Sequence, residues 1–172
     1  GGDLLDNIVA TGVELTVTGD VVIESGNTLQ AKGGDWSFGS LEIKDGGLYD
    51  ATSGTTTITD RTPAGYTIKA SGTGTRIIAN DGLFNITGNS GGNINAQNNA
   101  MFYNIDSHLT GKLDLQNQFT QNGTFTVYDG TVEAEPNTGI MTIGDLVLKS
   151  GTSFGNTALT GDWTIGSLII EG

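Results

Sequence analysis

The sequence has few or none of several residue types, and each shortage excludes a class of chemistry. It contains no cysteine, which excludes disulfides, thiolate nucleophiles and zinc–thiolate sites. Only 7 lysine and arginine residues stand against 19 acidic ones, and the net charge of −12 argues against binding to nucleic acid or an anionic membrane surface. No apolar run approaches the ~18 residues of a membrane-spanning helix, so no membrane insertion is expected.

Glycine, by contrast, is abundant, with 28 residues among 172, and it separates short stretches in which apolar and polar residues alternate. Alternation with period two predicts β-strands. Helical periodicity occurs only at residues 3–10, where a short strand is an equal alternative. The chain is therefore expected to form a single all-β domain over residues 1–172, with strands at residues 13–19, 40–46, 55–60, 66–71, 123–130 and 140–151.

Two long segments of the sequence resemble each other. Residues 19–46 recur as residues 144–172, and each copy carries one of the two tryptophans in a Gly-Asp-Trp motif. Residues 141–151 also match residues 163–172 at a shift of 22. A period of about 22 residues with two or three short strands predicts a parallel β-helix, or β-solenoid, for which a jelly roll or β-sandwich is the alternative. The two tryptophans are then expected to occupy equivalent positions in two similar coils.

Inward side chains of one solenoid coil must lie above those of the next, which fixes the register between coils. The Asn- and Gln-rich residues 85–106 are expected to form polar ladders and turns, with a flexible excursion as the alternative. The residues predicted to carry the stacking are tryptophans and aliphatic residues of the two copies, namely Trp36, Leu41, Ile43, Leu146, Leu148, Trp163, Leu168 and Ile170.

The two ends of the predicted solenoid suggest its partners. Residues 1–12 are a candidate cap at one end, whereas the other end, at Leu168 to Gly172, has no polar cap. An uncapped coil is an open strand edge, so we expect it to pair with neighbouring repeats or with another copy of the chain. The related coil near each end and the start at Gly1 without methionine indicate a segment of a longer repeat protein or a processed form.

Residues capable of catalysis are few. The single histidine, His108, follows Asp106 and Ser107, but adjacent residues of a strand point to opposite sides, which argues against a catalytic triad. A polysaccharide-cleaving enzyme would need paired carboxylates. The candidates are Asp45, Asp50, Asp60 beside Arg61, Asp129, Glu133 and Glu135. Because 19 acidic residues produce such pairs by chance, the chain is expected not to be an enzyme.

Binding sites are also weakly indicated. No cofactor is expected, although the oxygen-rich turns at residues 44–47, 80–82 and 128–130 are compatible with weak calcium binding. Thr-x-Thr pairs begin at Thr16, Thr55 and Thr124, and we interpret them as ordinary exposed strand surface because they do not recur in every coil. A surface glycan is a candidate partner, although core positions are favoured for the aromatic residues that would stack on sugars, Trp36, Phe102, Tyr103 and Trp163.

The segments GDWTIGSLII, NGTFTVYDGTV and SGTTTIT resemble the degenerate repeats of large bacterial surface and adhesin-like proteins. These are filamentous-haemagglutinin-like and pectin-lyase-like solenoids, and similar repeats occur in phage tail fibres and tailspikes. The resemblance covers most of residues 19–172 and implies a parallel β-helix that projects from a cell surface or virion. It transfers no catalytic residue.

The expected function is a non-catalytic structural or adhesive module, extracellular or on a virion, that serves as a spacer or assembly scaffold. A glycan- or receptor-binding fibre domain is the alternative, and a polysaccharide-cleaving enzyme is less favoured.

Overall fold

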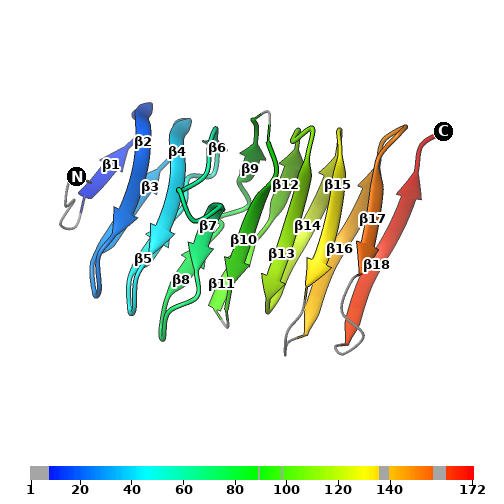
Figure 1. Ribbon diagram of the computed structural model, residues 1–172. Coiled ribbons are helices and arrows are strands. Elements are labelled where there is room, and N and C mark those ends of the chain that lie inside the picture. The colour runs from blue at the N-terminus through cyan, green and yellow to red at the C-terminus, as the bar shows by residue number, and fades with distance from the viewer. Residues whose placement is uncertain (1–7, 89, 98, 136–139, 157–161) are drawn as a thin grey trace.

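The computed structural model describes residues 8–88, 90–97, 99–135, 140–156 and 162–172. These residues form eighteen β-strands and no helix. Every strand pairing among them is parallel, and paired strands belong to successive turns of a β-solenoid (Figure 1). The predicted fold is confirmed, because a jelly roll or sandwich would pair its strands antiparallel.

Each turn contributes strands to three columns that run along the solenoid axis. The first column contains β1 (Ile8–Thr11), β3 (Thr28–Lys32), β5 (Leu48–Asp50), β8 (Arg76–Ile78), β11 (Asn99–Phe102) and the first halves of β14 (Phe119–Val127), β16 (Met141–Leu148) and β18 (Trp163–Ile170). The second column contains the first halves of β2 (Leu15–Ile23) and β4 (Trp36–Ile43), then β6 (Thr55–Ile58), β9 (Leu83–Ile86), β12 (Asn104–Ser107) and the second halves of β14, β16 and β18. The third column contains the second halves of β2 and β4, then β7 (Tyr66–Ala70), β10 (Gly92–Ala96), β13 (Lys112–Asn117), β15 (Thr131–Glu135) and β17 (Ser153–Asn156).

Successive coils are about 21 residues apart, close to the period predicted from the sequence. One coil is longer, since Thr56 pairs with Phe84, 28 residues later in the chain. The extra residues lie in loop 59–65, which leaves the coil between β6 and β7. A turn closes this loop, in which the amide of Gly65 donates to the carbonyl of Thr62 at 2.8 Å. The longer coil therefore adds residues without adding a strand.

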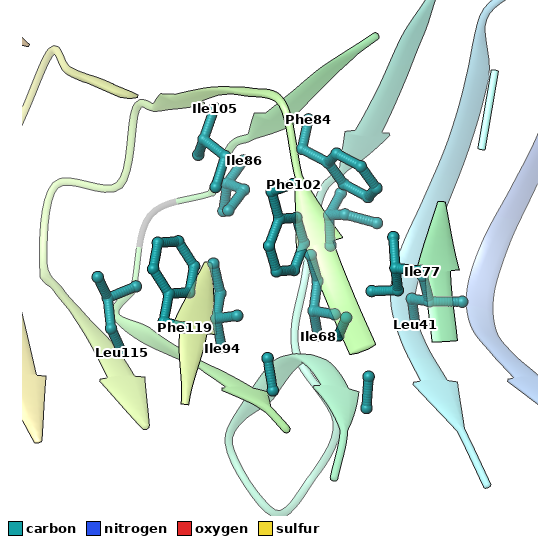
Figure 2. Packing of buried hydrophobic residues seen from close by; sticks show 14 of the residues in the cluster. Leu41, Ile68, Ile77, Phe84, Ile86, Ile94, Phe102, Ile105, Leu115 and Phe119 are labelled. Atoms are coloured by element: carbon teal, nitrogen blue, oxygen red, sulfur yellow. The ribbon is translucent and has the colours of Figure 1, made fainter. Parts of the chain in front are cut away.

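The interior is filled by side chains that alternate with outward ones along each strand. Seven aromatic rings form a continuous series along the axis, with neighbouring centroids 5.1–6.2 Å apart. Figure 2 shows Phe84, Phe102 and Phe119 of this series among isoleucines and leucines of several coils. Aromatic rings packed edge-to-face or offset in this way stabilise the contact beyond their burial. The rings belong to Trp36, Phe38, Tyr49, Phe84, Phe102, Phe119 and Phe125.

The described residues of the Asn- and Gln-rich middle form strands β9 to β12, so the alternative of a flexible excursion is wrong. Side-chain amides bridge neighbouring coils here. Nδ2 of Asn95 donates to Oε1 of Gln116 at 3.2 Å, and Nδ2 of Asn117 donates to Oδ1 of Asn95 at 2.6 Å. These contacts are the predicted polar ladder.

Residues 1–7 of the candidate cap lie outside the described residues. Residues 8–11 form β1, which pairs with β3 in the ordinary register, Val9 opposite Gln30 and Thr11 opposite Lys32. The described part of the candidate cap is therefore a regular strand of the first coil and not a helix.

The two Gly-Asp-Trp copies do not occupy equivalent columns, contrary to the prediction. Trp36 begins β4 in the second column, whereas Trp163 begins β18 in the first column, where it pairs with Met141. Both strands are eight residues long and bend at a glycine, so the copies are alike locally. Because loop 59–65 adds residues between the two copies, the second copy begins one column earlier in its coil than the first copy does. The register from Trp36 leads instead through Thr56, Phe84, Ile105, Phe125 and Leu146 to Leu168.

Candidate functional site

The residues predicted to stack fall into two groups. Five lie in the core, with at most 8% of their surface exposed, namely Trp36, Leu41, Ile43, Leu146 and Leu148. The other three belong to β18, the last strand of the described chain. There Trp163 is partly buried and packs edge-to-face on Phe154, whereas Leu168 and Ile170 are 54% and 70% exposed. The end coil therefore presents core-type side chains to solvent.

Lysine–carboxylate pairs connect neighbouring coils. Nζ of Lys44 lies 2.7 Å from Glu24, Nζ of Lys69 lies 2.8 Å from Glu42, and both partners are about one coil away in sequence. The hydrogen bond to Glu42 raises the pKa of Lys69 above its usual value. Two further pairs link coils nearer the C-terminus, Lys112 with Glu133 at 3.1 Å and Lys149 with Glu171 at 2.7 Å. Four of the 7 basic residues of the chain thus join coils instead of forming a basic patch.

A surface ladder follows the strand ends of the second column. The imidazole of His108 stacks on the ring of Tyr128, with centroids 4.3 Å apart and planes at 10°. Nζ of Lys149 lies 5.7 Å from the same tyrosine centroid on the next coil and pairs with Glu171 on the last. Ser107, by contrast, is 1% exposed on the inner side. Ser107 and His108 therefore point to opposite sides, as expected, and do not form a nucleophile–base pair.

Several of the candidate catalytic carboxylates serve as hydrogen-bond acceptors for neighbouring turns. Asp50 accepts from Gln30 and from Asn80, the latter at 2.6 Å, and Asp45 accepts from the amide of Thr73 at 3.1 Å. Of the remaining candidates, Asp60 accepts from the amide of Arg61, and Glu133 pairs with Lys112. Asp129 is exposed in a turn, and the side chain of Glu135 lies outside the described ones.

In the described part of the chain, no three acidic or histidine side chains come close enough to hold a metal ion. The turns at residues 44–47, 80–82 and 128–130 contain Gly46, Asn80, Asp81 and Gly130 with positive φ, the conformation that their sequences favour. Over the same residues there is no helix of the length and apolarity needed to cross a membrane.

The candidate sugar-stacking aromatics do not form one surface. Trp36 and Phe102 are each 1% exposed and belong to the core, which is the position favoured for them from the sequence. Trp163 is partly buried against Phe154, and only Tyr103, 37% exposed, faces solvent. The indole Nε1 of Trp36 donates to the carbonyl of Val13 at 2.9 Å, which fixes its orientation inside the coil.

Two threonine columns were not recognised from the sequence. Thr16, Thr57 and Thr126, one from each Thr-x-Thr run, share one position of the second column. Thr120, Thr142 and Thr164 follow one another in the first column, above Met101. The match of Thr142 with Thr164 was visible at the shift of 22, but the sequence around Thr120 does not resemble either. The three threonines of the first column follow at the coil spacing, whereas in the second column Asn85 and Asp106 stand between Thr57 and Thr126.

Comparison with protein families, with curated proteins and with solved structures finds no match to this chain. The chain is a parallel β-solenoid of about seven turns. This fold is the part of the resemblance to bacterial surface repeats that the structure shows.

Proposed function

We propose that this chain is a non-catalytic structural module of a bacterial surface or virion protein, in which it serves as an extracellular spacer or assembly scaffold. The observation that carries the proposal is that its side-chain bonds run mainly between coils. Lysine–carboxylate pairs, amide bridges and the aromatic series all join residues of neighbouring turns. These side-chain contacts hold each coil to the next along the solenoid axis.

The shape of the molecule supports the same proposal. The first and last described strands, β1 and β18, lie at opposite ends of the strand stack (Figure 1). About seven turns at a rise of ~4.8 Å give a stack roughly 34 Å tall. A module of this form separates what is attached to its two ends by a fixed distance, which is the property required of a spacer.

Two measurements test the proposal. Small-angle X-ray scattering should give the elongated profile of a solenoid, and incubation with acidic and neutral polysaccharides should release no reducing ends. Release of reducing ends by the unaltered chain, reduced at least tenfold by Glu133→Gln or Asp129→Asn, would contradict the non-catalytic assignment. Ser153→Ala serves as the control substitution. Ser153 lies in the third column, as Glu133 does, but its side chain carries no titratable group.

Glycan or receptor binding is a second candidate, favoured by one patch. Met101 and Tyr103 are 45% and 37% exposed and two residues apart, and Met101 lies beside Thr120, where the threonine column of the first column begins. An exposed aromatic ring beside hydroxyl groups suits a sugar. Glycan binding that Tyr103→Ala abolishes and Tyr128→Ala leaves intact would support this candidate over a passive spacer.

A further inference from the structure

Gly19 is a glycine that the packing of the described residues does not require. The bent strands carry glycine at their bends because neighbouring backbones approach closely there. A Cβ on Gly39, Gly144 or Gly166 would lie 2.5–2.8 Å from a carbonyl oxygen of the preceding coil. Gly19 occupies the same bend in β2, its φ lies outside the left-handed region, and a Cβ there would meet nothing within 4 Å. Glycine at this bend leaves room for the backbone of a further strand, as it does at Gly39, Gly144 and Gly166.

Exposed apolar side chains gather at the two ends of the solenoid. Leu168, Ile169 and Ile170 of β18 are 54%, 50% and 70% exposed, and among the described residues the outer edge of β18 pairs with no strand. At the other end Val9 and Val13 are 59% and 54% exposed. Open strand edges with apolar side chains are templates for pairing with another chain.

The contacts between the bent strands show which strands suit one another. β2 supports β4 through a bond from Oγ of Ser40 to Asp20 at 2.7 Å, and β16 supports β18 through the equivalent bond from Ser167 to Asp145 at 2.5 Å. The flanking ion pairs are also equivalent, with the charges exchanged: Glu24 with Lys44 in one case, Lys149 with Glu171 in the other. β2 and β18 therefore belong to two pairs of bent strands that are joined by the same kinds of contact.

We propose that the last coil of one copy pairs with the first coil of a second copy, rotated by one column so that β18 lies along β2. The inference rests on the proposed function as a scaffold and names its partner, which is the same chain. In this arrangement Gly166 packs against Gly19, Ser167 lies beside Asp20, and Ile170 lies beside Ile23. The rotation is required because the bend of β18 joins the first and second columns, whereas the bend of β2 joins the second and third.

An unrotated arrangement would continue the three columns but would leave the bends unmatched. Thr164 would then lie beside Val9 of the second copy, whereas the rotated arrangement places Thr164 beside Thr16. Both arrangements bring together two chains of net charge −12, and the rotated one also places Glu171 near Glu24. Added salt screens this repulsion, so association should strengthen with ionic strength.

Cysteine cross-linking distinguishes the two registers, because the chain has no cysteine of its own. Neighbouring strands lie ~4.8 Å apart, within the Cα distance that a disulfide spans. The variant Thr16→Cys/Thr164→Cys should give a ladder of oligomers on a non-reducing gel after oxidation, whereas Val9→Cys/Thr164→Cys should stop at the dimers formed by either single-cysteine control. Preferential or equal cross-linking of the Val9 variant, or no ladder from either, would overturn the rotated pairing.

Sedimentation across a concentration series gives an independent test. Gly19→Ala should leave the monomer folded and weaken association about tenfold or more, because the added methyl meets the carbonyl of Gly166 in the other copy. Ile170→Asp should have a similar effect, whereas Met101→Asp, 45% exposed on a strand that is paired on both sides, should not. An unaltered chain that stays monomeric at all concentrations would overturn the pairing. Its scattering profile would still test the spacer separately, since an elongated monomer retains the proposed function and a compact one does not.

Discussion

Lys69 and Glu42 are 27 residues apart in the sequence, yet their charged groups lie 2.8 Å apart because they stand on adjacent coils. The side chains are 37% and 25% exposed, so solvent screens the pair and limits its contribution to about 1 kcal/mol. Lys69→Met should therefore lower the urea midpoint only slightly.

The matched control is Lys32→Met, since Lys32 is exposed and forms no ion pair among the described residues. A double-mutant cycle with Glu42→Gln isolates the pair from other effects of the substitutions. A coupling energy indistinguishable from zero would show that this pair does not stabilise the stack.

Phe102 and Tyr103 are neighbours in the chain with opposite environments. Phe102 is 1% exposed between Phe84 and Phe119, whereas Tyr103 is 37% exposed. Phe102→Ala should cost about 3–5 kcal/mol of unfolding free energy, because it opens a cavity in the aromatic series. Tyr103→Ala should stay within about 0.5 kcal/mol. Equal costs in thermal or urea unfolding would contradict the assignment of the two sides.

The glycine at the bend of β16 has a specific steric role. A Cβ at Gly144 would lie 2.5 Å from the carbonyl oxygen of Gly123 and 2.6 Å from that of Asn122, and backbone atoms cannot move aside cheaply. Gly144→Ala should destabilise the fold by about 1–3 kcal/mol. Gly19→Ala, at the bend with open space, should be neutral or stabilising by less than about 1 kcal/mol. Circular dichroism melts of both variants at low protein concentration make the comparison, and a reversed order would refute it.

Tyr49 links stability to alkaline pH. Its side chain is buried, burial raises the pKa of its phenol, and its hydroxyl lies 2.9 Å from Oγ1 of Thr56. Since the folded pKa exceeds the unfolded value of about 10, the folded chain keeps a proton that the unfolded chain loses. The contribution of Tyr49 to stability should be complete below pH ~10 and decline as the pH rises further.

Tyrosinate absorbance followed together with circular dichroism checks this linkage. Ionisation of Tyr49 should coincide with unfolding, and Tyr49→Phe should remove that absorbance step. The variant should also lose about 1–2 kcal/mol, because the hydroxyl of Thr56 loses its buried partner. Ionisation of Tyr49 in the folded chain would contradict its burial.

The sequence predicted the architecture because a solenoid repeats one local rule. Alternation of apolar and polar residues gave the strands, and the shift of 22 between Met141 and Trp163 is also the register that joins them. The equivalence of Trp36 and Trp163 failed for a physical reason. Local similarity specifies a bent strand, but the column that this strand enters depends on every residue between the copies, including loop 59–65. That loop has no counterpart in the repeat from which its length could be inferred.

The contacts between coils were harder to predict than the core. Inward positions tolerate any apolar residue that fills the space, so a pattern is enough to identify them. The pair of Lys69 with Glu42, by contrast, requires the register between two particular coils, and one of these follows the irregular loop. The threonine column at Thr120, Thr142 and Thr164 was missed for a related reason, because the residues around Thr120 do not carry the repeat. Which surface side chains meet in a solenoid depends on the length of every coil between them. Whether a side chain is buried depends only on its position in the local alternating pattern.

Loop 59–65 has a consequence for how such a chain can change over time. It lengthens the polypeptide between β6 and β7, while Ile58 still pairs with Ile86 and Leu41 with Ile68 on either side. Insertions of this kind turn the later sequence repeats around the axis without changing the height of the stack. Two chains with the same number of coils can therefore display the same repeat in different directions, and a gain or loss of a few residues in one loop is enough to redirect it.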